Sequence, residues 1–497
     1  MTETTEKDFA IEIQGGVTVH VPADIKLMTP YILLEQEDWF EDEIKFIRTY
    51  LQPGMRVVDI GVNYGTYFLT AAKKVGETGK VWGFEPSSQC CEFVERSIAK
   101  NGFQNTALIK AGLSDRVGSA FLSTGANTEL NTVADSLGEN QEGESIELLT
   151  LDHCMDDLEL KDIDFMKIDA EGEESNIIRG GSKFFRENSP LVMFELKHGD
   201  SVNKKLIDEF IDIGYKTYRL VPGLNCLVSF DLDDPIDGYQ LNLFCCKQQK
   251  AEKLHQDEVL VDESVLGDSD QITDGLWIKY LSQYPYFKTM SNIFGDAFNQ
   301  SSSKEFGEYY RALDLYAFSH SNKKDTNKKY NALVDCKRIL EDLNIASPNI
   351  SIALTLARVS TELGYRVRAV EILGKIIELM QSGVELNFPV PFLSPVSLMD
   401  NIKVDNEFEK WIQASIFVSH QLLAAFSSYY MQPENINSLL FTNNIGIDVP
   451  EIRKRIFLTT GRFNYSNANS YLANLGRIEG SPNFNVWKEI LSNLDIS

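Results

Sequence analysis

The stretch VVDIGVNYG, residues 57–65, decides the fold of the N-terminal half of this chain. β-Branched residues lead into Asp59, and Gly61 and Gly65 then bracket three further residues. β-Branched side chains favour a buried strand, and glycines permit a tight turn after it. The stretch therefore predicts a strand, a glycine-rich turn and the start of a helix, an arrangement that can hold a nucleotide-like cofactor.

From residue 55 onward, short apolar segments alternate with segments of helical periodicity. This order predicts an α/β domain with a mostly parallel sheet that is covered by helices on both faces. Residues 11–35 contain turn signals and resemble a short β-rich lead-in, and residues 38–52 have helical spacing. The last strand follows a long loop, which suits an antiparallel edge strand. The expected strands are 55–60, 81–85, 107–110, 163–168, 191–196, 215–220 and 241–246, and the expected helices are 64–75, 87–101, 173–178 and 202–213.

The C-terminal half has a different pattern. Residues 247–275 are polar, acidic and poor in aromatic residues, which predicts a linker or a loosely packed connector. Beyond it helical periodicity dominates, and residues 353–379 predict two helices joined by a tight turn at Leu-Gly-Tyr. This pattern fits either a tetratricopeptide-type helix pair or a plain helical bundle. We therefore expect an α/β domain over 1–250, an acidic linker over 251–275 and an all-α domain over 276–497.

Composition argues against several classes of protein. The chain has 497 residues, too many for one hydrophobic core, and its net charge of −26 repels phosphate backbones, so nucleic acid is not an expected partner. The N-terminus lacks the pattern of a secretory signal, and no apolar run is long enough to cross a bilayer. The seven cysteines have no spacing that suggests a disulfide framework or a zinc site, so we expect a reducing cytoplasm.

Three classes of cofactor compete for the glycine turn. A phosphate-binding loop needs Lys followed by Ser or Thr at the head of the helix, and Thr66 and Tyr67 stand there instead. A dinucleotide fold needs another glycine where this chain has Asn63. S-adenosylmethionine carries an amino-acid end, a sulfonium and a ribose but no phosphate, and the turn favours it.

S-adenosylmethionine would find suitable partners beside the first two strands. Asp59 is placed to meet the ammonium group, and Gly61 and Gly65 let the backbone approach the methionine portion. Glu85, at the end of the second strand, can accept both ribose hydroxyls through its two carboxylate oxygens. Each feature alone is weak, and their order and spacing together carry the prediction.

Further motifs resemble those of FkbM-type methyltransferases. The segment KIDAEGEESNIIRGG (167–181) resembles the family's Lys-Ile-Asp-x-Glu-Gly-x-Glu signature. The segment DIGVNYGTY (59–67) resembles its Asp-x-Gly-Ala-Asn-x-Gly-x-Tyr motif, with Val62 where Ala is usual. The resemblance covers about residues 15–247. The remaining motifs are TPYILLEQEDWFEDE (29–43), FEP (84–86), AGLSD (111–115) and LTLD (149–152).

This resemblance implies the class I methyltransferase fold, a seven-stranded, mostly parallel, Rossmann-like sheet whose last strand is antiparallel. It also implies methyl transfer to oxygen, commonly to a sugar hydroxyl or a natural-product hydroxyl. The cofactor-binding residues that follow from the turn and from the resemblance are Asp59, Gly61, Asn63, Gly65, Thr66, Glu85, Pro86, Gly112, Leu113 and Asp169.

A hydroxyl acceptor is a poor nucleophile until it begins to lose its proton, so a general base or a metal is expected. Acidic residues follow the fourth and fifth strands, where ligands bind in open α/β sheets. We expect Asp169 or His198 to accept the proton. Glu171 and Glu195 would orient the sugar hydroxyls or the base, and Lys167 would neutralise an acid.

Other roles are open for these residues. Glu171 fits a cap of the next helix, and His198 fits an exposed turn. The carboxylates of Asp169, Glu171 and Glu195 would suit one Mg²⁺ ion, although we do not expect a metal in the site. The polar loop 123–144 is expected either to cover the acceptor or to be a disordered insertion. Trp39 and Glu41 would form a lid over the cofactor pocket.

These expectations combine into an S-adenosylmethionine-dependent O-methyltransferase that acts on a sugar hydroxyl in a glycan or a glycosylated intermediate. One alternative is methylation of a small natural-product hydroxyl. Another is a helical scaffold protein whose cofactor-binding domain does not catalyse. A large added surface suits a polymeric substrate or a glycosyltransferase partner, which the C-terminal helical domain would bind.

Overall fold

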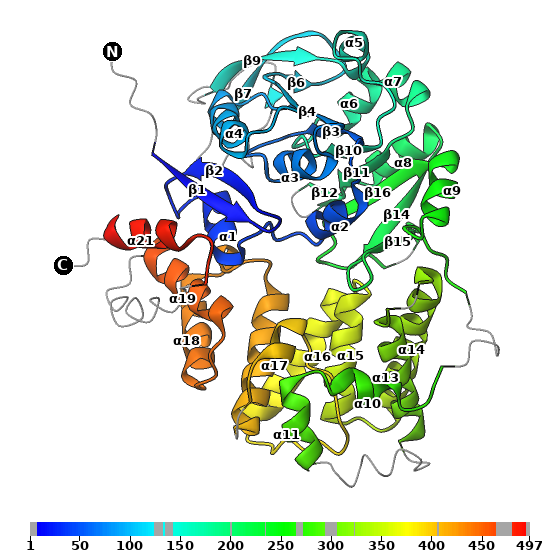
Figure 1. Cartoon of the computed structure of the whole chain (residues 1–497), viewed down its shortest axis with the longest axis vertical. Coiled ribbons are helices and arrows are strands. Elements are labelled where there is room, and N and C mark those ends of the chain that lie inside the picture. The colour runs from blue at the N-terminus through cyan, green and yellow to red at the C-terminus, as the bar shows by residue number, and fades with distance from the viewer. Residues whose placement is uncertain are drawn as a thin grey trace.

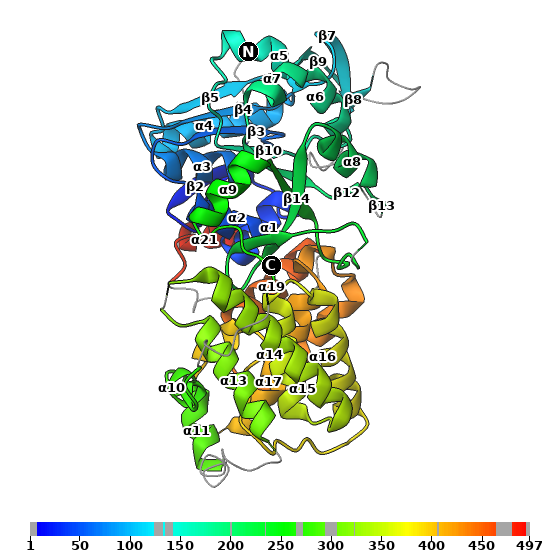
Figure 2. The ribbon, with the colours of Figure 1, turned by 90° about the vertical axis from the view of Figure 1, so that its right-hand side faces the viewer.

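The computed structural model describes residues 7–123, 133–134, 143–198, 201–233, 235–264, 272–293, 306–322, 324–404, 407–463 and 480–493. Figures 1 and 2 show an α/β region stacked on a helical region along the long axis of the molecule. None of the described helices is both long and apolar enough to cross a bilayer.

The α/β region is built on an eight-stranded sheet with the order β15-β14-β16-β11-β10-β3-β4-β5. The five strands from β11 to β5 are parallel, and β16 is antiparallel to both of its neighbours. The strands are β3 (Arg56–Ile60), β4 (Lys80–Phe84), β5 (Thr106–Ile109), β10 (Phe165–Ile168), β11 (Leu191–Glu195), β14 (Tyr215–Val221), β15 (Cys226–Ser229) and β16 (Asn242–Lys247).

This topology confirms the predicted α/β fold, with two differences. All seven expected strands are present, and β15 adds an eighth strand at the edge by pairing with β14. The last strand, β16, is antiparallel as expected, but it lies between β11 and β14 and not at an edge. Leu243, Phe244, Cys245 and Cys246 are all fully buried, and such a continuous apolar run is typical of a strand covered on both faces.

Helices cover both faces of the sheet because successive strand residues point to opposite sides. Val57 packs with the core that includes α3 and α4, whereas the next residue, Val58, packs with the core that includes α5 to α8. On β4, Val81 packs with the first of these cores and Trp82 with the second. The helices are α2 (Glu43–Tyr50), α3 (Thr66–Val75), α4 (Ser88–Asn101) and α9 (Gln248–Gln256) on one face, and α5 (Leu151–Asp157), α6 (Glu174–Gly180), α7 (Ser182–Glu187) and α8 (Lys204–Asp212) on the other.

The lead-in differs from the β-rich expectation. Strands β1 (Asp8–Ile13) and β2 (Val17–Pro22) form an antiparallel hairpin, but α1 (Met28–Gln36) follows as a helix. Pro30 lies in the first turn of α1, where a proline costs no backbone hydrogen bond. Two smaller sheets complete the region, one of order β6-β9-β7-β8 and one made of β12 and β13. Their strands are β6 (Gly112–Leu113), β7 (Gly118–Ser123), β8 (Val133–Ala134), β9 (Gly143–Leu149), β12 (Lys197–His198) and β13 (Ser201–Val202).

The helical region confirms the predicted helix pair. Helices α15 (Ile350–Glu362) and α16 (Arg366–Gln381) are joined at Leu363-Gly364-Tyr365, where Gly364 has a φ of +87° that favours glycine. The other helices are α10 (Leu276–Leu281), α11 (Pro285–Ile293), α13 (Gly307–Ser319), α14 (Thr326–Ala346), α17 (Phe408–Ala424), α18 (Ile436–Asn444), α19 (Pro450–Arg462) and α21 (Phe484–Asn493), with short 3₁₀ helices η2 (Ser397–Asn401), η3 (Ser428–Tyr430) and η4 (Pro433–Asn435).

The two regions share their hydrophobic cores. Phe457 of α19 and Trp487 of α21 pack into the core of the α/β region, with α21 against β1 (Figure 1). Val221 and Cys226 of the sheet pack into the core of the helical region. Helix α9, in the segment expected to be a connector, buries Ala251 in the α/β core. The C-terminal helices therefore dock on the sheet, and the domain limits at 250 and 275 remain a prediction.

Candidate active site

A cavity of about 790 Å³ lies beyond the carboxyl ends of the parallel strands. Ligands of open α/β sheets bind at this edge, and the volume is sufficient for a ligand larger than a single sugar. Most of the predicted site residues line it: Trp39, Glu41, Gly61, Asn63, Thr66, Glu85, Pro86, Gly112, Leu113, Asp169, Glu171 and Glu195. Asp59 and Gly65 lie behind the lining.

The turn between β3 and α3 forms one wall of this cavity. Gly61, Asn63 and Gly65 have φ angles of +80°, +51° and +90°, which glycine and asparagine tolerate best. A Cβ atom on Gly61 would lie 1.7 Å from the carbonyl oxygen of Asp169. Gly61 is therefore needed so that this turn can touch the turn after β10, a protein contact that the sequence analysis did not anticipate. Its approach to the methionine portion of a cofactor stays a prediction.

Glycine is also required at position 65 because of close packing, besides the positive φ angle. A Cβ atom on it would lie 3.2 Å from a methyl carbon of Leu69 and 3.3 Å from one of Val94, so the position is tightly packed. Gly65 is not among the residues that line the cavity, and its expected contact with a cofactor stays a prediction.

Glu85 follows β4 and is fixed at the edge of the cavity. Its Oε2 accepts the N–H of Asn63 at 2.7 Å, and its Oε1 accepts the N–H of Ser87 at 2.9 Å. Burial raises the pKa of Glu85 to about 7, against the effect of these two hydrogen bonds. Each carboxylate oxygen can accept a further hydrogen bond, so the side chain is pre-oriented to receive two hydroxyl groups.

Asp59 stands behind the cavity wall on β3. It is 2% exposed, and neither carboxylate oxygen has a hydrogen-bond partner among the described residues. Burial raises the pKa of Asp59 to about 7, while Lys167, its neighbour in the sheet register, acts in the opposite direction. An unpaired buried carboxylate is costly, and a cation in the cavity would reduce that cost.

Lys167 is the centre of the charged cluster. It is 5% exposed, and its Nζ lies 2.8 Å from a carboxylate oxygen of Asp169 and 5.3 Å from the ring centre of Tyr67. Burial acts to lower the pKa of Lys167, but Asp169 and Asp59 outweigh it and raise that pKa. The expected neutralisation of an acid by Lys167 is therefore seen in the pair with Asp169.

Glu41 enters the same cluster from the segment before α2. Its carboxylate accepts the hydroxyl of Tyr67 at 2.5 Å, and burial raises its pKa. Both Tyr67 and Glu41 line the cavity, so this hydrogen bond holds the carboxylate of Glu41 in the cavity wall. Trp39 lines the cavity beside it, and the lid role expected for the two residues stays a prediction.

The cavity has an excess of negative charge. Of the described residues that line it, six carry carboxylates and only Lys167 carries a positive charge. Burial and the nearby Asp169 and Glu171 together raise the pKa of Glu195 to about 9, so this carboxyl is protonated at neutral pH and the negative charge comes from the other acids. Such a site attracts a sulfonium and an ammonium group and repels phosphate, which favours S-adenosylmethionine over a dinucleotide.

The alternative roles of these acids can be compared with the geometry. Glu174, and not Glu171, accepts the N–H groups of Ala170 and Gly172 at the start of α6. Within the described part of the chain, no group of three or more His, Cys, Asp or Glu side chains is arranged to hold a metal ion. The side chain of His198 and most of the loop 123–144 lie outside the described residues.

Sequence reasoning missed several residues of this site. Tyr67 was used to exclude a phosphate loop and as part of the family motif, but its contact with Glu41 was not anticipated. Phe426, Tyr429 and Tyr430 line the cavity from the helical region, far along the chain from the glycine turn. No spacing or motif in the sequence connects these three residues to the turn.

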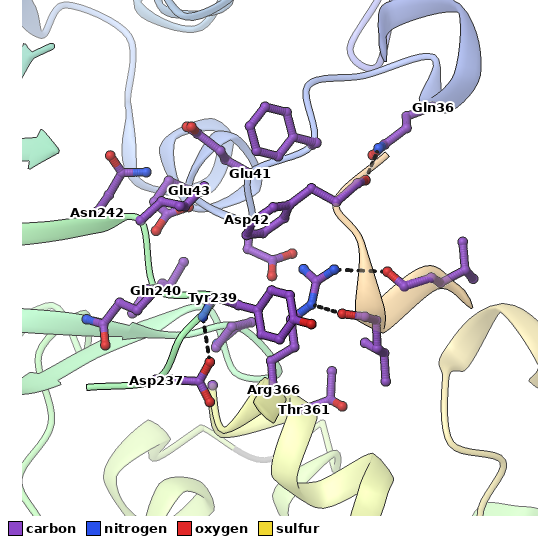
Figure 3. A pocket seen from close by; sticks show the side chains of 18 of the residues that line it. Gln36, Glu41, Asp42, Glu43, Asp237, Tyr239, Gln240, Asn242, Thr361 and Arg366 are labelled. Carbon is purple, nitrogen blue, oxygen red and sulfur yellow. Dashed lines mark hydrogen bonds between the residues drawn. The ribbon is translucent and has the colours of Figure 1, made fainter. Parts of the chain in front are cut away.

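A second cavity of about 370 Å³ adjoins the first, in the crevice between the two regions (Figure 3). Phe40, Glu41, Leu241 and Phe426 line both cavities. The guanidinium of Arg366 lies in the crevice, 4.4 Å from the ring centre of Phe426. The two cavities thus meet where the helical region touches the α/β region.

Comparison with family models gives a match for one part of the chain. Residues 59–219 match the family model described as the methyltransferase FkbM domain. No curated protein matches the chain.

Solved structures of methyltransferases are similar at low identity. The methyltransferase FkbM from Methylobacillus flagellatus KT is 15% identical, with 39% of this chain and 43% of that chain covered and a TM-score of 0.27. A SAM-dependent methyltransferase from Aquifex aeolicus is 15% identical, with 43% and 92% covered and a TM-score of 0.26. A SAM-dependent O-methyltransferase from Thermotoga maritima is 13% identical, with 48% and 77% covered and a TM-score of 0.25. Similarities of this size carry no inference about the substrate.

Proposed function

We propose that this chain, a SAM-dependent methyltransferase with an FkbM domain at residues 59–219, methylates a sugar hydroxyl in a glycan or a glycosylated intermediate. The observation that carries the proposal is the acidic cavity at the strand ends, with Glu85 fixed by two backbone N–H groups and carboxylates grouped around Lys167. This arrangement suits a cationic cofactor beside a hydroxyl-rich acceptor.

The residues of the α/β region would hold S-adenosylmethionine, which supplies an electrophilic methyl group on a sulfonium. Glu85 would accept the ribose hydroxyls through the lone pairs that its two backbone contacts leave available. Asp59 is buried and has no hydrogen-bond partner among the described residues, and it would balance the positive charge of the cofactor from behind the wall. The turn at Asn63 and Thr66 would shape the adjoining surface.

Asp169 is our candidate for the general base. It lines the cavity at the end of β10, with one carboxylate oxygen 2.8 Å from the Nζ of Lys167, and a carboxylate in this place can accept the proton of a hydroxyl group. Glu171 and Glu195 line the same part of the cavity and would orient the acceptor hydroxyls. His198 remains a second candidate for the base.

A sugar acceptor is supported by the mixture of side chains in the cavity. Carboxylates accept hydrogen bonds from hydroxyl groups, and the aromatic rings of Trp39 and Phe40 offer apolar surface for a ring face. Methylation of a small natural-product hydroxyl is the alternative.

We also propose that the helical region binds a glycosyltransferase partner. All seven cysteines are free and buried, which supports a reducing cytoplasm as the location.

Two measurements test the proposal. Titration calorimetry with S-adenosylmethionine should show binding by the full chain and a loss of affinity on the order of 10–100-fold for Glu85→Gln. Glu77→Gln, at an exposed turn, is the matched control. Transfer of labelled methyl from the cofactor to a panel of methyl glycosides and disaccharides then identifies the acceptor. Absence of binding by the full chain would favour the scaffold alternative.

A further inference from the structure

One wall of the large cavity comes from the helical region. Phe426, Tyr429 and Tyr430, in the segment that follows α17, line this wall. The ring centre of Phe40, from the α/β region, lies 5.2 Å from that of Phe426 and 6.4 Å from that of Tyr430. The cavity is therefore closed jointly by the two regions of the chain.

A buried polar network fastens this segment to α1. Glu35 accepts two hydrogen bonds from Ser428, one from its N–H at 3.0 Å and one from its hydroxyl group. The hydroxyl of Ser428 also lies 2.8 Å from the hydroxyl of Tyr31. Arg455 of α19 completes the network with its Nε 3.2 Å from Glu35. Glu35 and Arg455 are each 2% exposed, and a buried charge pair requires well-defined geometry, so the network fixes the segment on α1.

Further contacts fix the aromatic residues themselves. Arg366 donates hydrogen bonds of 2.6 and 2.9 Å to two carbonyl groups at the end of α17 and lies over the ring of Phe426 (Figure 3). Gln36 donates to the carbonyl of Phe426 at 2.6 Å. The guanidinium of Arg462 lies 3.8 Å from the ring centre of Tyr429 and donates to the carbonyl of that residue. The wall is thus preorganised.

The predicted cofactor contacts do not require this wall. The glycine turn, Glu85 and Gly112 all belong to the α/β region and line the cavity from the strand ends. Tyr430, by contrast, is 47% exposed although it is a large aromatic residue. An aromatic side chain that is held in place and still exposed within a ligand cavity is available to contact a ligand.

We propose that Phe426, Tyr429 and Tyr430 form the acceptor-binding wall, against which the ring of the acceptor packs while the carboxylates at the strand ends bind its hydroxyls. The inference rests on the proposed function and adds that the helical region selects the acceptor. The acceptor class is a ring that has one apolar face and several hydroxyl groups, such as a pyranose. The helical region is therefore part of the active site, and its aromatic residues determine specificity.

The test uses the full chain and labelled S-adenosylmethionine. One acceptor panel contains methyl hexopyranosides and disaccharides, and a second contains small phenolic and polyketide-type alcohols. For the best acceptor, Phe426→Ala and Tyr430→Ala should each raise KM on the order of tenfold, because an aromatic contact is lost. The Kd of S-adenosylmethionine, measured by calorimetry, should change by less than about twofold, since the cofactor contacts lie elsewhere.

Two further variants control for folding. Tyr430→Phe keeps the ring and should keep KM near that of the wild type. Phe441→Ala removes a ring that is 51% exposed on α18 and does not line either cavity, and it should change neither constant. Circular dichroism and the Tm of each variant confirm the fold.

The outcomes separate the inference from the proposed function. An unchanged KM in both alanine variants, with transfer by the wild type intact, overturns the inference alone. Loss of cofactor binding in a correctly folded Tyr430→Ala assigns the wall to the cofactor and also overturns it. A wild type that binds the cofactor but methylates no member of either panel overturns the proposed function and, with it, the inference.

Discussion

The two sides of the large cavity are built in opposite ways. On the cofactor side, Glu85 accepts the N–H of Asn63, which is only 22 residues away, and both residues lie on turns that follow two neighbouring parallel strands, β3 and β4. On the aromatic side, Ser428 is held by Glu35, 393 residues away, across the contact between two regions. The first side needs only one sheet to form. The second side exists only when the regions dock, so the two sides should respond differently to substitution.

Replacement of Asp169 by Asn should have the largest effect, and it should lower the rate of methyl transfer more than the affinity for the cofactor. An amide cannot accept the proton of the acceptor, so we expect kcat to fall by about 10²–10⁴-fold. The Kd of S-adenosylmethionine should change far less. Single-turnover methyl transfer measures the effect, and Asp208→Asn, at an exposed position of α8, is the control. A kcat close to that of the wild type would leave His198 as the base.

Replacement of Glu35 by Ala tests the aromatic side. The variant leaves Arg455 buried without its carboxylate partner, so the free energy of unfolding in urea should fall by about 3–5 kcal/mol. The acceptor KM should rise as well, because Ser428 loses its anchor. Glu35→Ala combined with Arg455→Met should recover part of the stability, since no unpaired charge remains. Additive losses in the double variant would show that the pair is not coupled.

Replacement of Gly61 by Ala tests the cofactor side through its backbone. The new methyl group would lie 1.7 Å from the carbonyl oxygen of Asp169, at a φ of +80°. We expect a loss of about 2–4 kcal/mol in the free energy of unfolding. Gly214→Ala is the matched control, because its φ is +85° but no atom lies within 4 Å, so it should lose only about 1 kcal/mol. Equal losses would mean that the contact between the turns is unimportant.

The pH dependence of cofactor binding should show the smallest effect. Burial raises the pKa values of Asp59 and Glu85 to about 7, so both are largely protonated at pH 6. Protonated Asp59 no longer balances the positive charge of the cofactor, and protonated Glu85 accepts the ribose hydroxyls less strongly. Affinity for S-adenosylmethionine should rise between pH 6 and pH 7.5 by about tenfold, and an α-amino group keeps most of its charge over that range. Calorimetry at several pH values measures this rise, and Glu85→Gln should weaken the pH dependence. A Kd independent of pH would contradict the charge argument.

Much of the α/β region could be predicted because its signals are local. Strands β3, β4, β5, β10 and β11 each begin and end within two residues of the expected positions, and the turn at Leu363-Gly364-Tyr365 joins two helices as expected. Apolar periodicity and glycine positions act over a few residues, so they are visible without a structure. Helix α1 was missed because turn residues such as Pro30 also occur in the first turn of a helix.

Other features depended on contacts that no local pattern contains. The internal position of β16 depends on β14 pairing with its outer edge, and the need for Gly61 depends on the carbonyl of Asp169. Tyr67 gained its role from Glu41, which approaches from a different element. In each case the partner is distant in the chain, and only the docking of elements shows which residues meet.

The sequence by itself determined that strand, turn and helix follow one another at residues 57–65 and that carboxylates stand at the ends of the strands. Periodicity and turn chemistry are properties of neighbouring residues, so Glu85 and Asp169 could be chosen in advance. Only the tertiary structure decided that Phe426 and Tyr430 close the cavity. Their position depends on the buried pair of Glu35 and Arg455, which forms when α19 docks on α1.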